Sequence, residues 1–240
     1  MRSDGISAQA VGAMRKTGAR LLLGVDTCGP SGSVALGWLA GEQFQLLEQI
    51  ELEGRSYSAR VVAAIGELLT YVGAKVGELG AIVAVNGPGS FTGVRVGLSA
   101  VKGLAEAASI SVVVVSRLEV LAWKAGARFS ALDAHRHEVF FRMGRSGESE
   151  KEILAGEAEL VAMAPVNEKI AVCDDAAAAL LVSLWPDVEL ARALAPTAAD
   201  ALGFCSSKVS ADEFVDLALL DGHYLRRSDA EIFGDATKVR

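Results

Sequence analysis

A helix that contains several glycines constrains this chain more than any other stretch. Residues 86–107 form the sequence NGPGSFTGVRVGLSAVKGLAEA, which follows the apolar run AIVAV, typical of a buried strand. The NGPG turn separates strand from helix, and Ser90 or Thr92 can cap the helix N-terminus. Gly97 and Gly103 lie inside the helical pattern, and each costs about 1 kcal/mol relative to alanine. Close packing against another part of a protein is needed to offset that cost.

Small residues form a continuous stripe along this helix. They recur at helical spacing at Gly93, Gly97, Ala100, Gly103 and Ala107. A bare stripe lets another backbone approach closely, and dispersion contacts then offset the low helix propensity of glycine. The partner can be the chain's own sheet or another helix across an interface, and the pattern alone leaves both alternatives open.

A second amphipathic helix precedes the strand. The segment SYSARVVAAIGELLTYVG places Val61, Ile65, Leu68 and Val72 on one face, and Gly73 suits a C-cap. Its own stripe of small residues consists of Ala59, Ala63, Gly66 and Thr70. The two helices are therefore expected to pack together and to present a joint surface.

Strands and helices occur in two blocks, which predicts an α/β fold with two related lobes. Residues 20–108 have the predicted order βββαβα, and residues 109–209 begin again with the buried strand SVVVVS. In the second block we expect strands at ARFSALD, EVFFRMGR, GEAELVAM and KIAVCD, and helices at RLEVLAWKAG, DDAAAALLVSLW and TAADALGFCSSKV. Residues 1–19 are expected to be a flexible leader, and residues 210–240 to pack back on the first lobe.

The composition favours a folded protein and disfavours several function classes. Of the 240 residues 51% are apolar, and the net charge of −7 argues against a basic surface that wraps nucleic acid. The 3 cysteines stand far apart, which indicates neither a disulfide framework nor a zinc site and fits a reducing compartment. The apolar run LLLGV is too short for a signal peptide or a membrane span.

Two turns resemble anion sites without matching an established motif. GPGSFTG has glycine spacing one residue longer than the dinucleotide fingerprint and lacks the GK[ST] of a Walker loop. Asp26 and Thr27 end the first strand before a glycine hairpin, as in the phosphate-binding hairpins of the actin class, although Asp26 could simply cap the turn. These observations make Asp26, Thr27, Gly87 and Gly89 a candidate site for weak nucleotide or phosphate binding.

Asp133, His135 and His137 alternate along the chain and could share one strand face as metal ligands. We favour a solvated turn at residues 134–137, because carboxylates and imidazoles are common at hairpin tips. No spacing links a serine, a histidine and an aspartate into a nucleophilic set. The residues therefore indicate neither a catalytic nor a metal site.

Four stretches of the chain carry a resemblance to a known family. They are LLLGVDTCGPSGSVAL, VNGPGSFTGVRVGLSAVKGLAEA, ALDAHRHEVFF and HYLRRSDA, and they occur in the family's order. The chain resembles the bacterial TsaB (YeaZ) family, the dimerization subunits of tRNA threonylcarbamoyladenosine biosynthesis. The resemblance implies an actin-like (ASKHA) two-lobed fold, each lobe a mixed sheet flanked by helices. It also implies a non-catalytic role beside the paralogous transferase subunit TsaD.

The resemblance further implies partners and a location. TsaD and the ATPase subunit TsaE are the expected partners, with a homodimer when the chain is alone, contact with tRNA only through the complex, no membrane contact and a cytoplasmic location. No cofactor is expected beyond weak binding of ATP or ADP. The His-x-x-x-His metal pair of the catalytic paralogue falls here at Arg117 and Leu121, neither of which can replace a histidine ligand. Tyr57 and His135 depart from residues usual in the family.

The resemblance also implies pairing through the two helices, here residues 56–72 and 92–107. The expected partner-binding residues are Val61, Ile65, Leu68, Leu69, Gly93, Gly97, Ala100, Gly103 and Leu104. We predict that a bulky residue at Gly97 or Ala100 abolishes pairing. The alternative functions are an ATP-dependent kinase or phosphatase that uses the actin-like cleft and, for lack of a nucleophile set, less plausibly a peptidase.

Overall fold

The first sheet combines a meander from the start of the chain with two later strands. The computed structural model describes residues 18–143, 150–163 and 168–226. Its first sheet has the strand order β3-β2-β1-β4-β5. The strands are β1 (Arg20–Asp26), β2 (Ser31–Ala40), β3 (Gln43–Glu53), β4 (Leu79–Val85) and β5 (Val112–Val115). The first three pair antiparallel, and β4 and β5 continue parallel to β1, so β1 lies at the centre, where its apolar run is buried on both faces.

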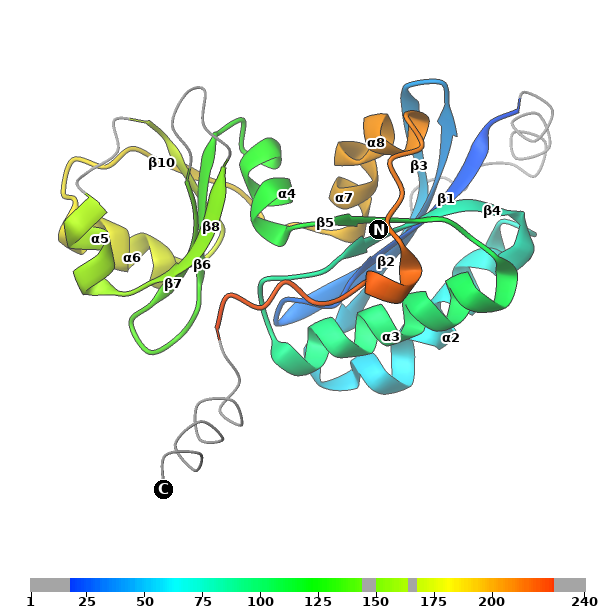
Figure 1. Cartoon of the computed structure of the whole chain (residues 1–240), viewed down its shortest axis with the longest axis horizontal. Helices are drawn as coiled ribbons and strands as arrows, with labels where there is room; N and C mark the ends of the chain where they lie inside the picture. The colour runs from blue at the N-terminus through cyan, green and yellow to red at the C-terminus, as the bar shows by residue number, and fades with distance from the viewer. Residues whose placement is uncertain (1–17, 144–149, 164–167, 227–240) are drawn as a thin grey trace.

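Helices cover both faces of this sheet. On one face α2 (Tyr57–Tyr71) and α3 (Phe91–Ala108) lie side by side, and α7 (Ala198–Phe204) and α8 (Ser206–Ser210) lie on the other (Figure 1). The Oγ atom of Ser90 caps α3 by accepting a hydrogen bond from the Gly93 amide at 3.2 Å. Short 3₁₀ helices η1 (Gly54–Ser56), η2 (Val76–Glu78) and η3 (Leu217–Leu219) complete the lobe.

The second lobe is built on its own five-stranded sheet, with the order β10-β9-β6-β7-β8. Its strands are β6 (Phe129–Asp133), β7 (Val139–Met143), β8 (Lys151–Ala155), β9 (Ile170–Val172) and β10 (Leu190–Arg192). Its helices are α4 (Arg117–Lys124), α5 (Glu157–Met163) and α6 (Asp175–Leu184). A core with Phe129, Phe141 and Trp185 at its centre holds α5 and α6 against the sheet. The fold is therefore the two-lobed, actin-like α/β architecture that the resemblance implies.

The structure corrects two expectations about the second block. Residues of GEAELVAM form helix α5 instead of a strand, because alanine, glutamate, leucine and methionine favour a helix and the Glu159 carboxylate accepts from the Gly156 amide at 3.0 Å. The lobes also divide at other positions than residues 108 and 209. Strand β5 pairs with β4, and α7 packs on the first core through Ala198, Ala201 and Leu202.

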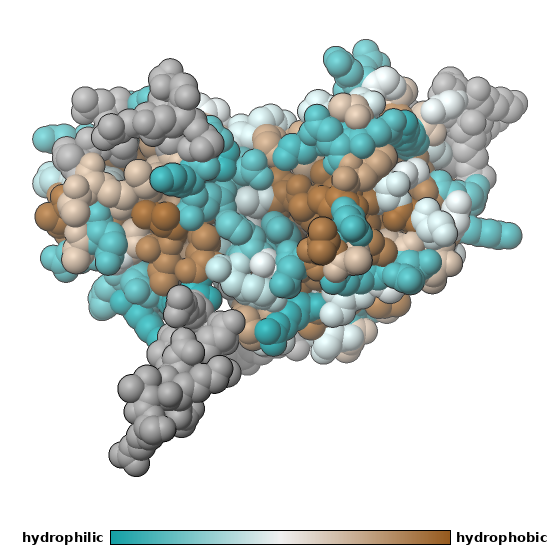
Figure 2. Space-filling model, viewed as in Figure 1, coloured by the Kyte–Doolittle hydropathy of each residue, from teal (hydrophilic) through white to brown (hydrophobic). Residues whose placement is uncertain are grey.

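The chain after α8 returns along the first lobe. The amide of Val215 donates to the carbonyl of Val112 at 2.9 Å, which adds backbone pairing beside β5. The expected leader at residues 1–19 lies outside the described part, except for Gly18 and Ala19. In the described ranges no helix is both long and apolar enough to cross a bilayer. On the face seen in Figure 2, hydrophobic residues gather on each lobe and the strip between the lobes is mainly hydrophilic.

Candidate functional site

The first glycines of α3 pack against the chain's own sheet. A Cβ atom on Gly93 would overlap the carbonyl oxygen of Thr27, and a Cβ on Gly97 would overlap the Thr27 hydroxyl. That hydroxyl donates to the carbonyl of Gly93 at 2.7 Å, so strand end and helix touch directly. Of the two alternatives for the glycine stripe, packing within the lobe therefore holds at these two positions.

The end of the same stripe is open. Gly103 is exposed, and a Cβ built on it would meet nothing within 4 Å. Ala100 and Leu104 are half-buried and pack on the edge of the first core. The stripe therefore winds from the sheet side of α3 at Gly93 to its solvent side at Gly103.

The expected partner-binding side chains of α2 point into the molecule. Val61, Ile65, Leu68 and Leu69 are at most 5% exposed and belong to the first core. Together with Gly93 and Gly97 they cannot touch a partner without rearrangement of the lobe, so the residue assignment was wrong for these six positions. The pairing of the helices themselves stays a prediction, and a bulky residue at Gly97 would test the fold and not the pairing.

The outer face of α2 carries the second small-residue stripe. Ala59, Ala63, Gly66 and Thr70 are all exposed, and a Cβ on Gly66 would meet nothing within 4 Å. Val62 (58% exposed) and Tyr71 (54% exposed) lie on the same helix. Sequence reasoning missed these two residues, although apolar side chains off the buried stripe of an amphipathic helix are a usable signal. On α3, Ser99, Gly103 and Ala107 also face solvent. We define these nine residues as the outer helix face.

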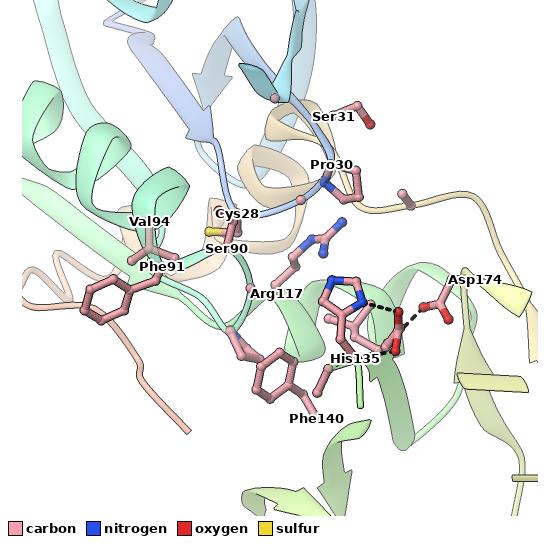
Figure 3. A pocket seen from close by; sticks show the side chains of 18 of the residues that line it. Cys28, Pro30, Ser31, Ser90, Phe91, Val94, Arg117, His135, Phe140 and Asp174 are labelled. Carbon is pink, nitrogen blue, oxygen red and sulfur yellow. Dashed lines mark hydrogen bonds and ion pairs between the residues drawn. The ribbon is translucent and has the colours of Figure 1, made fainter. Parts of the chain in front are cut away.

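A cleft of about 1460 Å³ lies between the lobes. The turn between β1 and β2, the start of α3, the start of α4, the turn between β6 and β7, and the C-terminal segment all contribute to its walls. Figure 3 shows Arg117 in this cleft, with Pro30 and Ser31 above it and His135 below in that view.

The four residues predicted for phosphate binding are mostly out of reach of the cleft. Asp26 is 0% exposed and Thr27 is 1% exposed, and only Gly89 of the four contributes to the cleft wall. One carboxylate oxygen of Asp26 accepts from the Cys28 amide at 2.8 Å, which is the turn cap that the sequence left as an alternative. Gly87 adopts a φ of 118° against the backbone of His223. Nucleotide binding through these residues stays a prediction that their burial disfavours.

Asp26 also faces the side chain of Arg117. The second carboxylate oxygen of Asp26 lies 4.0 Å from Nε of Arg117, and both side chains are buried. Burial raises the pKa of Asp26 above its ordinary value, although Arg117 and the Cys28 amide act to lower it. The pair is thus a loosely matched buried ion pair, of which Arg117 lines the cleft and Asp26 lies behind it.

The turn between β6 and β7 is strained. His135, Arg136 and His137 all have positive φ, near 60°, which non-glycine residues rarely adopt. Nδ1 of His135 lies 2.9 Å from a carboxylate oxygen of Asp133, and the hairpin-tip interpretation agrees with this local pairing. In the described ranges no group of three or more His, Cys, Asp or Glu side chains could hold a metal ion.

The C-terminal segment connects the two lobes at the cleft. The amide of His223 donates to the carbonyl of Asn86 at 2.7 Å in the first lobe, and its Nε2 lies 2.9 Å from Glu152 in the second. The Tyr224 ring packs on Phe91 with 5.0 Å between centroids. The pKa of Glu152 is lowered. Burial alone would raise it, but hydrogen bonds from His223 and Ser116 outweigh burial.

Comparisons with known proteins agree with this architecture. The chain is 36% identical over 126 residues to the tRNA threonylcarbamoyladenosine biosynthesis protein TsaB of Haemophilus influenzae, covering 50% of this chain and 52% of that protein. The protein of the same description from Escherichia coli is 35% identical over 126 residues, covering 50% and 53%. The chain thus spans about half the length of the curated relatives that it matches.

Solved structures extend the match over more of the chain. YeaZ from Pseudomonas aeruginosa superposes with a TM-score of 0.63 and 28% identity, covering 86% of this chain and 100% of that one. A second Pseudomonas aeruginosa structure, an uncharacterized protein with similarity to peptidase YEAZ, gives a TM-score of 0.66 and 29% identity at 86% and 100% coverage.

Fold and site together define a two-lobed protein of the actin-like class, with a helix pair on one lobe and a cleft between the lobes. A family model described as TsaD, tRNA N6-adenosine threonylcarbamoyltransferase, matches residues 47–170, just over half of the chain. The chain belongs to this family, on its TsaB (YeaZ) branch.

Proposed function

We propose that this chain is a non-catalytic subunit in tRNA threonylcarbamoyladenosine biosynthesis, and that it pairs with a TsaD transferase through the outer helix face. A role in this pathway is supported by its relatives, which are described as tRNA threonylcarbamoyladenosine biosynthesis proteins. The observation that carries the pairing is the open small-residue stripe of α2 and α3, where Gly66 and Gly103 have free space above them. In the absence of that transferase, the same face joins two copies of the chain.

The outer helix face has the properties of a helix–helix contact surface. Its small residues let a partner helix approach to a short interaxial distance, and its glycines would otherwise only weaken their helices. Val62 and Tyr71 supply apolar area, and full burial of one such side chain contributes about 1.5–3 kcal/mol. A complementary helix pair on the partner would cover both stripes at once.

The residues at the positions of the catalytic paralogue's metal pair support a role without chemistry. Arg117 and Leu121 are both buried in α4, and neither side chain can ligate a metal as histidine does. The net charge of −7 favours contact with tRNA through the partner subunit and not through this chain. The TsaE-type ATPase subunit completes the proposed assembly.

The pairing is tested with substitutions that the monomer tolerates. Gly66→Leu and Gly103→Leu place a bulky side chain in open space, so each variant should fold at least as stably as the wild type, since leucine has the higher helix propensity. Co-purification and light scattering with the TsaD subunit should then show a loss of complex. Ala179→Leu, at an exposed position of α6 in the second lobe, is the matched control and should pair normally. Normal pairing of both glycine variants would contradict the interface.

The non-catalytic role needs a separate measurement. The purified chain should transfer no threonylcarbamoyl group to tRNA, while addition of the chain to TsaD and TsaE should restore transfer. Robust transfer by the chain alone would refute the role, even if the interface experiment succeeds.

A further inference from the structure

The last described residues of the chain are fastened to the first lobe. Leu220 is 4% exposed in the first core, and the amide of His223 donates to the carbonyl of Asn86 at 2.7 Å. Residues 223–226, which we define as the terminal strap, continue from there towards the second lobe (Figure 1). They belong to no helix or strand. The position of the terminal strap therefore depends on its side-chain contacts.

Side chains attach the terminal strap to the second lobe. Nε2 of His223 lies 2.9 Å from Glu152 on β8, and Leu225 packs on an apolar cluster of that lobe. Arg226 pairs with Glu138 in the turn before β7. Among the residues that the structure describes, no backbone–backbone hydrogen bond joins the strap to the second lobe. Contacts of this kind can open locally without loss of a sheet or a helix.

The side chains of the strap alternate between the lobes. His223 and Leu225 face the second lobe. Between them in sequence, the ring of Tyr224 packs on Phe91 of the first lobe with 5.0 Å between centroids. This alternation is the pattern of an extended chain. The chain bends at Leu225 and Arg226, and Arg226 also faces the second lobe, so the strap presents a basic residue, a leucine and an arginine to one surface.

The surface under the strap combines an apolar centre with two carboxylates. The apolar centre consists of Leu132, Ala134 and Phe140, which are at most 8% exposed and line the cleft. Phe140 is seen at the wall of the cleft in Figure 3. Glu138 and Glu152 supply the two carboxylates, one for each basic side chain of the strap. We define these five residues as the strap site.

The carboxylate of Glu152 keeps other partners when the strap leaves. It accepts hydrogen bonds from Ser116 at 2.6 Å and from Arg142 at 3.1 Å, in addition to its contact with the strap. Burial acts to raise the pKa of Glu152, but hydrogen bonds from His223 and Ser116 lower it overall, so the carboxylate is ionised near neutral pH. Departure of the strap therefore exposes a charged and oriented carboxylate. It does not leave an unpaired buried charge, which would be costly.

We propose that the strap site binds an extended segment of a partner protein, and that the terminal strap fills the site until this segment displaces it. The partner segment carries the order of side chains that the strap itself shows, namely a basic residue, any residue, a leucine and an arginine. Charge complementarity with Glu138 and Glu152 supports a basic segment over an acidic one. The inference does not depend on the proposed function, because the strap site and the outer helix face share no residue.

A release variant separates the strap from its site. His223→Ser/Leu225→Ser removes two side chains that contact the second lobe and keeps the anchors on the first lobe. The probe is the peptide DGHYLR, residues 221–226, titrated into the isotope-labelled full chain and followed by amide chemical shifts. The wild-type strap competes as a tethered ligand at an effective concentration of about millimolar. The peptide should therefore bind the release variant at least about tenfold more tightly than the wild type, with shifts at β7 and β8.

Matched changes locate the binding. In the release variant, Glu152→Gln should weaken peptide binding by about tenfold, because a charge-assisted hydrogen bond is lost. A peptide with serine in place of its leucine should bind the release variant about tenfold more weakly, because the apolar centre loses its contact. Asp221→Ser is the control. Asp221 is exposed and its carboxylate accepts from the adjacent Gly222 amide at 2.7 Å, so this variant should bind the peptide as weakly as the wild type does.

Equal peptide affinity of the wild type and the folded release variant overturns the proposal, as does binding that neither Glu152→Gln nor the leucine change weakens. If circular dichroism shows that the release variant is unfolded, Leu225→Ala takes its place. Light scattering examines a second copy of the chain as the donor. Wild-type dimers that dissociate in the release variant would make a second copy the source of the segment and would overturn its assignment to a partner.

Discussion

Alanine substitutions of two glycines in α3 should change the free energy of unfolding in opposite directions. Gly97 and Gly103 lie in the same helix, six residues apart, and gain the same helix propensity on replacement, about 1 kcal/mol each. At Gly103 a Cβ meets nothing within 4 Å, so Gly103→Ala should stabilise the protein by about that amount.

At Gly97 the same methyl group collides with the sheet. A Cβ there would lie less than 3.0 Å from the hydroxyl of Thr27, which donates a buried hydrogen bond of 2.7 Å to Gly93. Overpacking costs about 1–3 kcal/mol. Displacement of the hydroxyl from its acceptor adds about 1–3 kcal/mol. After the gain in propensity, Gly97→Ala should destabilise the protein by about 1–5 kcal/mol.

The free energy of unfolding of both variants is measured by urea unfolding followed by circular dichroism. Thermal unfolding gives a second measurement, in which the midpoint should shift by about 2–4 °C per kcal/mol for a protein of this size. The double variant Thr27→Ala/Gly97→Ala should be less destabilised than the sum of its single variants, because the collision is removed. A stabilising effect of Gly97→Ala, or the same sign at both positions, would refute the packing argument.

Two other predictions concern the cleft. Glu152 has a lowered pKa in the folded protein, so it contributes stability above its ordinary pKa of 4.5 that is lost as the pH falls through the folded value. In the Glu152→Gln variant, the urea midpoint should therefore fall less steeply as the pH is lowered. The substitution should also break the contacts of His223 and Ser116 with this carboxylate, so the backbone amides of the C-terminal segment should exchange faster. An unaltered profile would contradict this. Tyr57→Phe removes a buried hydrogen bond of 2.8 Å to the Gly29 carbonyl and should cost about 0.5–1.5 kcal/mol in urea unfolding, whereas a neutral effect would show that water replaces the hydroxyl.

The order of the elements from β1 to α3 could be predicted because local patterns determine it. The apolar run of β1, the helical spacing of α2 and the Ser90 cap of α3 are each visible within a few residues. Helix α5 was mistaken for a strand because a short apolar segment fits both periods.

The exposed side of each helix could not be identified from the pattern, because a stripe of small residues suits a close contact with any neighbouring backbone. Which side of α3 meets the sheet depends on Thr27, which lies 66 residues before Gly93 in the chain. The contact of Asp26 with Arg117 is equally non-local, so no local pattern indicated that the predicted phosphate residues are covered. The outer stripe of α2 was identified correctly as small, but its exposure became known only from the structure.

The first lobe contains two stretches of chain, and the second lobe lies between them in the sequence. This affects the order in which the lobes can fold during synthesis. Helix α7 seals one face of the central strand, with Ala198 and Leu202 against Gly24. While a ribosome is still adding the residues before α7, that face of the sheet stays uncovered, although every strand of the sheet has already been made. The second lobe, continuous between α4 and β10, can close first, and the lobe that carries the outer helix face becomes complete last.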